Sequence, residues 1–145
     1  MRLWHKDLLP YLPDRQFKGQ LRELVSIMRD WRDKGKTNHL LINRVMDYPK
    51  SHLFLYFLGY AMEYEKRYGK PVSDKIFIEF TIFCGTYKYV GEVFNGWHDF
   101  LYAKMCMTNL CEKYIYGKGS SQITYSEWAT LRRGFYKVTG HEFVI

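Results

Sequence analysis

Cysteine is scarce in this chain, and its few copies show no pairing pattern. Cys84, Cys106 and Cys111 are odd in number and include no CxxC pair, which argues against a disulfide framework and against a thiolate zinc site. The five histidines show no HxxxH or HExxH spacing, so no metal-binding motif is present. We therefore expect three buried thiols, no metal and no cofactor.

Long apolar runs are also missing. The longest strongly apolar stretch, Leu53–Met62, is far shorter than the roughly 18 to 20 residues that span a bilayer. The charged start, Met1–Asp7, lacks the apolar core of a signal peptide. We expect no membrane partner and a cytoplasmic location, at the nucleoid in a bacterium or in the host cytoplasm for a phage.

Apolar side chains are nevertheless plentiful and follow helical spacing. Hydrophobic residues make up 47% of the 145 residues and aromatic residues 19%, which excludes an intrinsically disordered chain. Pro10 and Pro13 predict an extended N-terminal arm that lasts until Asp14, a good N-cap residue. The next residues predict a helix over 15–34, ended by Gly35. Similar signals predict further helices over 38–46, 50–68, 73–84, 97–116 and 124–138.

Two local alternatives accompany this assignment. Residues 76–83 are rich in Ile and Phe and fit a strand on β-propensity alone, although we favour a helix. Either Thr124 or Ser126 can cap the last helix. The stretch 117–121 is expected to be a surface loop rather than a domain boundary, because too little chain follows it to form a second core. We thus predict an all-α, compact, monomeric single domain over 1–145, with the arm packed near the first helix.

Positive charge is concentrated at the start of the chain. The net charge is +7, and residues 1–50 hold 11 Lys and Arg against 6 Asp and Glu, a net +5. Such asymmetry suits a polyanionic partner, because each phosphate that Lys or Arg neutralises releases condensed counterions. The plainer interpretation is that the charge only aids solubility.

Four cations of the first predicted helix share a face. At 100° per residue, Arg15, Lys18, Arg22 and Arg29 fall within about 60° of one another. A row of guanidinium groups can bind successive phosphates, and the alternative is an ordinary solvated face. Glu23 lies off this row, and Gly19, one turn earlier, costs about 1 kcal/mol of helix stability relative to Ala. We infer that the missing side chain lets a ligand approach the Glu23 carboxylate, whereas a plain surface charge is the alternative.

Two segments resemble a known family. The segment Arg2–Pro13 (RLWHKDLLPYLP) and the segment Gly19–Leu24 (GQLREL) are similar to the pyrimidine-dimer DNA glycosylases, the phage and bacterial endonuclease V type of base-excision enzyme. The similarity is weaker through Tyr48-Pro49 and the helix that follows. Later in the chain, only Lys113–Lys118 (KYIYGK) resembles the aromatic, glycine-containing tail of the phage-type enzymes.

The resemblance implies a reaction and a set of residues. In the family, an N-terminal α-amine attacks the sugar C1′ at the lesion, releases the base as a Schiff base forms, and allows β-elimination of the strand. The family's glutamate matches Glu23, which would stabilise the cationic imine. Its arginines match Arg2 and Arg22, which would hold phosphates beside the lesion. The implied partner is double-stranded DNA that contains damaged bases or abasic sites.

The start of the chain departs from the family pattern. Phage-type enzymes expose a threonine after the initiator Met is removed, whereas Arg2 should leave Met1 in place. Met1 is then the expected nucleophile, and Arg2 would be exposed instead if other processing occurred. Further DNA contacts are expected from Lys118 and from Tyr114 and Tyr116, whose rings could stack on bases or could serve as core and rim residues.

The leading hypothesis is a metal-free DNA glycosylase with abasic-site lyase activity, in which Met1, Arg22 and Glu23 carry the chemistry. A non-catalytic helical DNA-binding or partner-binding protein on the same scaffold is the second. A metal-dependent nuclease ranks last, because the sequence has no DxD or ExK signature. The sequence leaves open the exact lesion and the role of residues 119–145.

Overall fold

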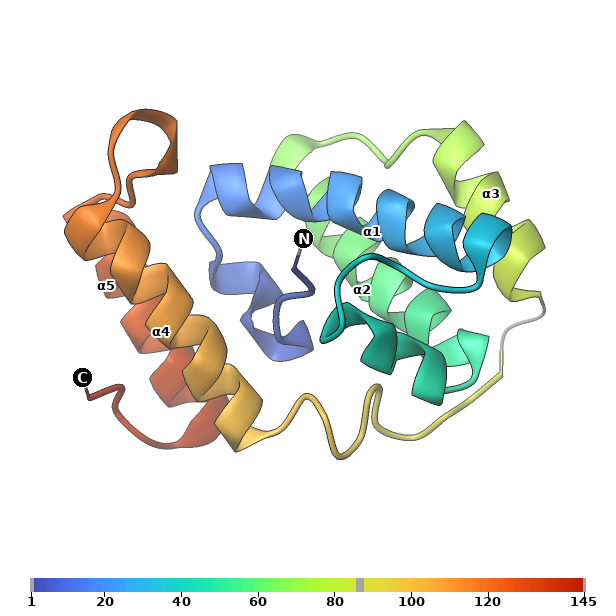
Figure 1. The fold of residues 1–145 in the computed structure, drawn as a ribbon. Coiled ribbons are helices and arrows are strands. Elements are labelled where there is room, and N and C mark those ends of the chain that lie inside the picture. Colours follow the sequence, from blue (N-terminus) through green and yellow to red (C-terminus); the bar gives the residue numbers. More distant parts are fainter. Residues whose placement is uncertain (1, 86–87, 145) are drawn as a thin grey trace. The chain divides into compact units, whose positions relative to one another are not determined.

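Helices account for all the regular secondary structure in the described part of the chain, as predicted. The computed structural model describes residues 2–85 and 88–144 and is shown in Figure 1. In chain order, its elements are the 3-10 helix η1 (Lys6–Tyr11), α1 (Asp14–Lys34), η2 (Ile42–Asp47), α2 (Lys50–Tyr68), α3 (Asp74–Cys84), α4 (Phe100–Tyr116), η3 (Gly119–Ser121) and α5 (Tyr125–Thr139). Of these helices, none has the length and apolar character needed to cross a membrane.

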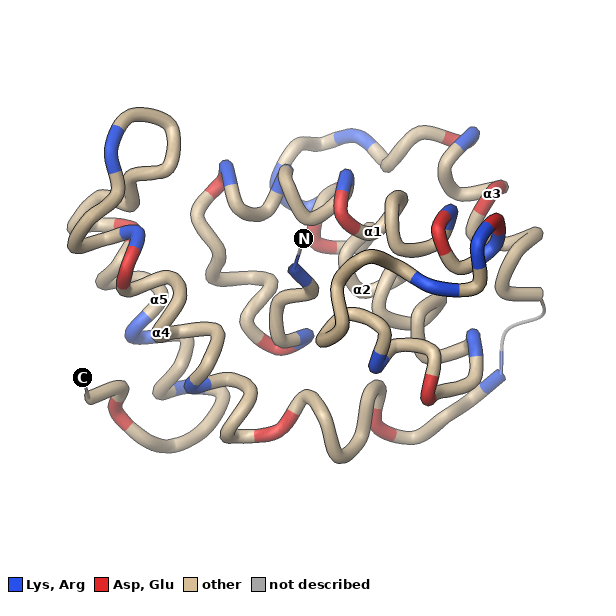
Figure 2. Tube along the Cα trace, viewed as in Figure 1, with Lys and Arg blue, Asp and Glu red and all other residues tan. Residues whose placement is uncertain are grey.

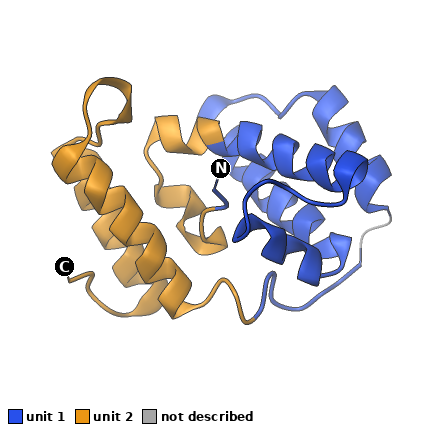
Figure 3. Cartoon of the chain, in the orientation of Figure 1, with its two compact units in different colours: residues 1–3, 20–95 blue, residues 4–19, 96–145 orange. Residues whose placement is uncertain are grey.

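The chain folds into two compact units, coloured separately in Figure 3. Unit 1 consists of Met1–Leu3 and Gln20–Asn95, and unit 2 of Trp4–Gly19 and Gly96–Ile145. Helix α1 contributes its first residues, through Gly19, to unit 2 and the rest to unit 1. A single domain over the whole chain stays a prediction.

Local signals place most helix ends where the sequence predicts them. Helix α2 ends at Gly69, which takes the left-handed conformation with φ 68°, and Gly140 does the same after α5 with φ 75°. The cap of α5 is Thr124 rather than Ser126, since the Thr124 side chain accepts a hydrogen bond from Glu127 N. The strand alternative for residues 76–83 is wrong, because Ser73 caps a helix over this segment.

Three expectations need correction. The N-terminal arm is extended only in part, because Lys6–Tyr11 forms η1, in which the His5 side chain accepts a hydrogen bond from Asp7 N. The helix expected over 38–46 is a 3-10 helix that begins at Ile42. The helix expected from Trp97 begins at Phe100, because the Asp99 carboxylate caps it by accepting from Tyr102 N at 2.9 Å.

The core of unit 1 joins α2 to α3 and to the segment before residue 95. Phe57 on α2 stacks on Phe80 of α3, with ring centroids 4.0 Å apart, and both are fully buried. Phe94 is also fully buried, and it is held with a positive φ of 54°. Its N–H donates to Nδ1 of the buried His52 at 2.9 Å. The neutral form of His52 therefore anchors a backbone conformation that a non-glycine residue rarely adopts.

Protonation of His52 should weaken unit 1. Burial lowers the pKa of His52 from 6.5, so the unfolded chain binds this proton more readily than the folded chain. The stabilisation is complete above pH 6.5 and is lost as the pH falls through the folded-state pKa. In His52→Asn, the amide oxygen can still accept from Phe94 N and does not titrate. We expect the free energy of unfolding to fall less in this variant than in the parent between about pH 7.5 and about pH 5, in urea titrations. An equal fall in both proteins would contradict this role.

Unit 2 is built on α4, α5 and η1. Helices α4 and α5 pack on each other, and η1 packs on α5. Trp128 of α5 stacks on Tyr114 of α4 at 5.5 Å and meets Phe143 edge-on at 5.7 Å. Cys106 and Cys111 are buried in this unit, as predicted, whereas Cys84 in unit 1 is half-buried. Burial raises the pKa of the Cys84 thiol to about 11.

Gly134 is required where η1 meets α5. A Cβ atom at this position would lie 2.7 Å from Cβ of Tyr11 and closer still to its ring. Gly134→Ala should therefore lower the free energy of unfolding by about 1–3 kcal/mol through overpacking, although Ala is the better helix former. Gly59→Ala is the matched control, because nothing lies within 4 Å of its added methyl group. Urea denaturation should show the control unchanged or up to about 1 kcal/mol more stable, and equal effects of the two changes would refute the packing constraint.

Candidate active site

Gln20 joins the start of the chain to helix α1 within unit 1. Its side chain is 1% exposed, and its Nε2 donates to the carbonyl oxygen of Arg2 at 2.8 Å. Its Oε1 accepts from the Tyr56 hydroxyl of α2 at 3.3 Å. A buried amide that is satisfied at both ends is costly to displace, so the backbone at Arg2 is held against α1.

Glu23 lies one helical turn after this anchor. Residues three apart on a helix are separated by about 4.5 Å along the axis and lie on neighbouring faces. Glu23 is half-buried and Arg22 is exposed. Neither forms an ion pair within the described part of the chain, whereas other charged residues of α1 do. Arg2, Arg22 and Glu23 thus belong to one unit, together with an anchor that fixes the backbone of the first of them.

Met1, the expected nucleophile, lies outside the described residues. Gly19 lies within α1 and is half-buried. The role of its missing side chain stays a prediction.

Arg29 is engaged by a carboxylate. Its Nε and Nη2 donate to the two carboxylate oxygens of Glu79 on α3, at 3.0 and 2.7 Å. Arg32 approaches the same carboxylate at 3.4 Å. This pairing raises the pKa of Arg29 and holds the pKa of Glu79 below its usual value. A phosphate would have to compete with Glu79 for Arg29, and DNA binding by Arg29 and by Arg22 stays a prediction.

The remaining predicted DNA contacts lie in unit 2. The Arg15 guanidinium donates to the carbonyl oxygens of Gly119 and Ser120, and Lys18 pairs with Asp14 at 3.3 Å. Tyr116 is 78% exposed and Lys118 is exposed. Tyr114 instead stacks on Trp128, which gives it a packing role. DNA binding by these residues stays a prediction.

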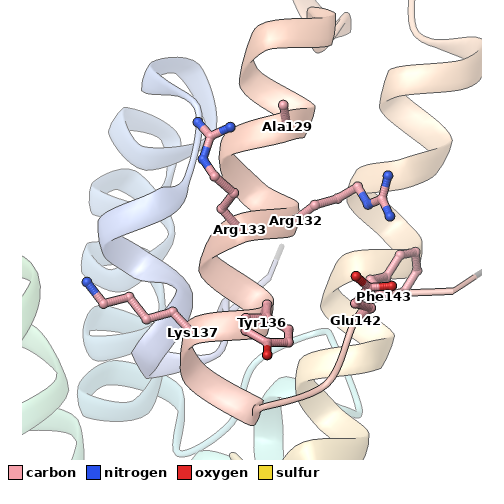
Figure 4. A pocket seen from close by; sticks show the side chains of 7 residues that line it. All are labelled: Ala129, Arg132, Arg133, Tyr136, Lys137, Glu142 and Phe143. Atoms are coloured by element: carbon pink, nitrogen blue, oxygen red, sulfur yellow. The ribbon is translucent and has the colours of Figure 1, made fainter.

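A basic pocket on α5 was not anticipated from the sequence. It has a volume of about 650 Å³, and its lining includes Arg132, Arg133, Lys137 and a single acid, Glu142. In Figure 4, Arg133 and Lys137 extend to one side of α5, and Arg132 extends toward the segment with Glu142. No ion pair to any of these three cations is seen among residues 2–85 and 88–144. The three cations lie close together in the sequence of the last helix and could have indicated this pocket. The larger excess of positive charge in residues 1–50 made the cluster less prominent.

Gln20 is the other residue that sequence reasoning missed. It lies between Phe17 and Leu24, at the helical spacing of the apolar stripe of α1. A glutamine on an apolar stripe is a sign of a buried hydrogen-bonding partner, although the sequence does not say which partner.

Comparison with known protein families identifies the family to which the chain belongs. A family model described as pyrimidine dimer DNA glycosylase matches residues 1–76. The chain belongs to this family. The suspected resemblance is confirmed, and with it the assignment to a family of DNA-repair glycosylases for which DNA with pyrimidine-dimer damage is the partner. The search of curated proteins and the search of solved structures gave no match.

The matched part of the chain contains Arg2, Gln20, Arg22 and Glu23. It ends within α3, so neither the α5 pocket nor Tyr114, Tyr116 and Lys118 is covered. A search for groups of three or more His, Cys, Asp or Glu side chains that could hold a metal ion found none in the described residues.

Loss of the Gln20 anchor should be measurable without any substrate. Gln20→Leu keeps the approximate size of the side chain but removes both hydrogen bonds, which leaves buried polar groups to be desolvated. We expect the free energy of unfolding to fall by about 1–3 kcal/mol, and the first residues to become faster substrates for an aminopeptidase. Gln16→Leu, at a half-buried position one turn earlier, is the matched control and should change neither property. Unchanged aminopeptidase cleavage of Gln20→Leu would show that this amide does not hold the N-terminus.

Proposed function

We propose that this pyrimidine dimer DNA glycosylase couples base removal to abasic-site lyase activity, through a Schiff base formed at the α-amine of its first residue. The observation that carries the proposal is the Gln20 amide bound to the Arg2 carbonyl, one helical turn before Glu23. Covalent geometry keeps the α-amine of a residue that precedes Arg2 within about 3.6 Å of the Arg2 nitrogen. An anchored Arg2 therefore restrains the amine as well, in the same unit as the carboxylate.

An α-amine suits this reaction better than an ordinary lysine. Its unperturbed pKa of about 7.7–8.0 leaves roughly 10 to 15% of it neutral at pH 7, compared with about 0.04% of a lysine near 10.4. The neutral amine attacks C1′, and the glycosidic electron pair leaves with the base. Loss of a proton from nitrogen and opening of the sugar ring then give a cationic imine. Removal of a C2′ proton expels the 3′ phosphate by β-elimination.

We assign to Glu23 the role of stabilising the positive charge of the imine. A carboxylate that forms no ion pair with the cations of residues 2–85 and 88–144 can stabilise the positive imine and accept or relay a proton. Arg22 precedes it on the helix and is exposed, which suits a phosphate next to the lesion. Arg2 would contact a second phosphate, with its backbone held by Gln20.

Binding to the duplex would use cations from several parts of the chain. In unit 1 these are Arg2 and Arg22, and Arg29 only if it leaves Glu79. In unit 2 they are Arg15, Lys18 and Lys118, together with the three cations of the α5 pocket, and Tyr116 offers an exposed ring. Abasic sites would be substrates alongside pyrimidine dimers, because the imine forms at C1′ whether or not a base has first to be expelled.

Borohydride trapping on DNA with a single abasic site tests the proposal. Reduction converts an imine into a stable amine, so an imine-forming enzyme becomes covalently attached to the strand. A non-catalytic DNA-binding protein on the same scaffold would bind the same oligonucleotide without attachment. Tight binding with no covalent adduct would overturn the proposed chemistry.

Glu23→Gln separates the carboxylate charge from its size and hydrogen bonding. We expect strand cleavage to fall by a factor of about 100 or more, as is typical when a group that acts on developing charge is removed, while DNA binding survives. Glu65→Gln is the matched control, an exposed glutamate on α2 of the same unit, and it should cleave like the parent. Single-turnover cleavage and DNA affinity measured together would decide the matter, and near-normal turnover of Glu23→Gln would mean that the carboxylate is a bystander.

A further inference from the structure

The pocket on α5 lies in unit 2, beyond the part of the chain that the family model matches. Its volume of about 650 Å³ is within the range of about 300–1,000 Å³ that is typical of ligand sites. Helix α5 supplies most of the lining, and the segment after the helix adds Glu142 and the buried Phe143. The proposed reaction gives this pocket no role beyond contacts with phosphates.

The α5 side of the pocket has an apolar floor with cations on both flanks. At about 100° per residue, Tyr136 lies within about 20° of Ala129 around the helix axis, so the two residues form a line along α5. Arg132 falls on one side of this line, and Arg133 and Lys137 fall on the other, as Figure 4 shows. Tyr136 is 56% exposed. Its ring, next to the small side chain of Ala129, thus offers a surface for a flat group between cations.

The charge of these three cations is not neutralised within residues 2–85 and 88–144. Figure 2 marks the charges along the trace, and residues 128–141 contain the three cations and no Asp or Glu. Arg133 and Lys137 are one turn apart, a spacing at which like charges repel. Arg133 donates only to the neutral Thr130 hydroxyl, at 3.2 Å, and Glu142 pairs with none of the three. Helices α1 and α2 instead pair cations with acids one turn earlier. A bound anion would relieve the repulsion on α5.

The floor and the flanks together fit a ligand that has both an anionic group and a flat apolar face. An isolated anion would use the cations but not the exposed ring of Tyr136. A nucleotide joins a phosphate to a planar base, and DNA is the partner of the family. In a duplex, the faces of the bases are covered by their neighbours in the stack. A base face is therefore available to Tyr136 only in a single strand or in a free nucleotide.

We propose that the α5 pocket binds a nucleotide through both its base and its phosphate. The base stacks on Tyr136, and the phosphate is held by Arg132 on one flank or by Arg133 and Lys137 on the other. Every base has a face that can stack on an aromatic ring, so we expect little sequence preference. The nucleotide belongs either to a single DNA strand or to the free pool, and both present the same chemistry. The site goes beyond the proposed function, because it requires no Schiff base.

Fluorescence anisotropy of a labelled, undamaged single-stranded oligothymidylate tests the stacking on Tyr136. Tyr136→Ala in the full chain should weaken binding about 10-fold, because stacking of one base on an aromatic ring contributes a factor of roughly 5 to 150. Tyr136→Phe keeps the ring, so its affinity should stay within about twofold of the parent. Tyr89→Ala is the matched control, since it removes an exposed tyrosine (84%) from unit 1, and it should bind like the parent.

The double variant Arg133→Gln, Lys137→Gln tests the phosphate contacts. We expect its affinity for oligothymidylate to fall about 10-fold or more, and the slope of log affinity against log salt concentration to fall by about 0.7 for each phosphate contact that is lost. The double variant Lys66→Gln, Lys75→Gln makes the same change in net charge at exposed positions of α2 and α3. This control should leave both the affinity and the slope close to those of the parent.

Competition with thymidine monophosphate identifies the source of the nucleotide. Displacement of the oligothymidylate by the monophosphate supports a pocket that a free nucleotide fills, whereas tight binding of the oligothymidylate alone supports a strand. Equally effective displacement by inorganic phosphate or by an oligoglutamate peptide would overturn the proposal, because the base would then contribute nothing. An unchanged affinity of Tyr136→Ala, an equal loss in the control variants, or no binding of either nucleotide probe by the parent would overturn it as well. Failure of the proposed chemistry is recognised separately, since these measurements use undamaged DNA and need no imine.

Discussion

The hydrogen bond from the buried Gln20 amide to the Arg2 carbonyl is the constraint on which the account of this protein depends. A chain terminus is ordinarily mobile, and a terminal amine is a useful nucleophile only if its position relative to the other reacting groups is restricted. Gln20 holds the backbone of Arg2 from inside the core of unit 1, where Tyr56 satisfies its other end, and we propose that this restricts the amine of the preceding residue. Because Gln20, Arg22 and Glu23 share one helix, the rigidity of α1 relates the held backbone of Arg2 to the Glu23 carboxylate and to Arg22, the cation to which we assign a phosphate. The placement of the proposed site thus depends on a core contact.

Local chemistry in the sequence predicts most of the fold. Helix α2 begins and ends at its predicted residues, and Ser73, Thr124 and Gly140 mark helix ends as capping rules require. The family was also accessible from two short segments of sequence. What the sequence could not supply are contacts between residues far apart in the chain. The partner of Gln20, the pairing of Arg29 with Glu79 and the closeness of Tyr11 to Gly134 depend on tertiary packing. For the same reason, the cationic face of α1 looked uniform in the sequence although its members have different partners.

The two compact units differ in what they share with the family. The match covers residues 1–76 and contains every residue to which we assign chemistry, whereas α4 and α5 lie beyond it. Unit 2 has its own aromatic core around Trp128 and its own basic pocket, and α1 runs from unit 2 into unit 1. The chemistry is therefore assigned to a short segment near the start, and the later helices contribute stability and positive charge.

The central claim is that the first α-amine of the chain performs the attack, and peptide mapping of the borohydride-reduced adduct on abasic DNA tests it most directly. We expect the sugar to be attached at residue 1, or at residue 2 if Met1 has been removed. Attachment at the side chain of Lys6, Lys18 or Lys36 would contradict it, because a lysine would then perform the chemistry and the Gln20 anchor would have no catalytic purpose.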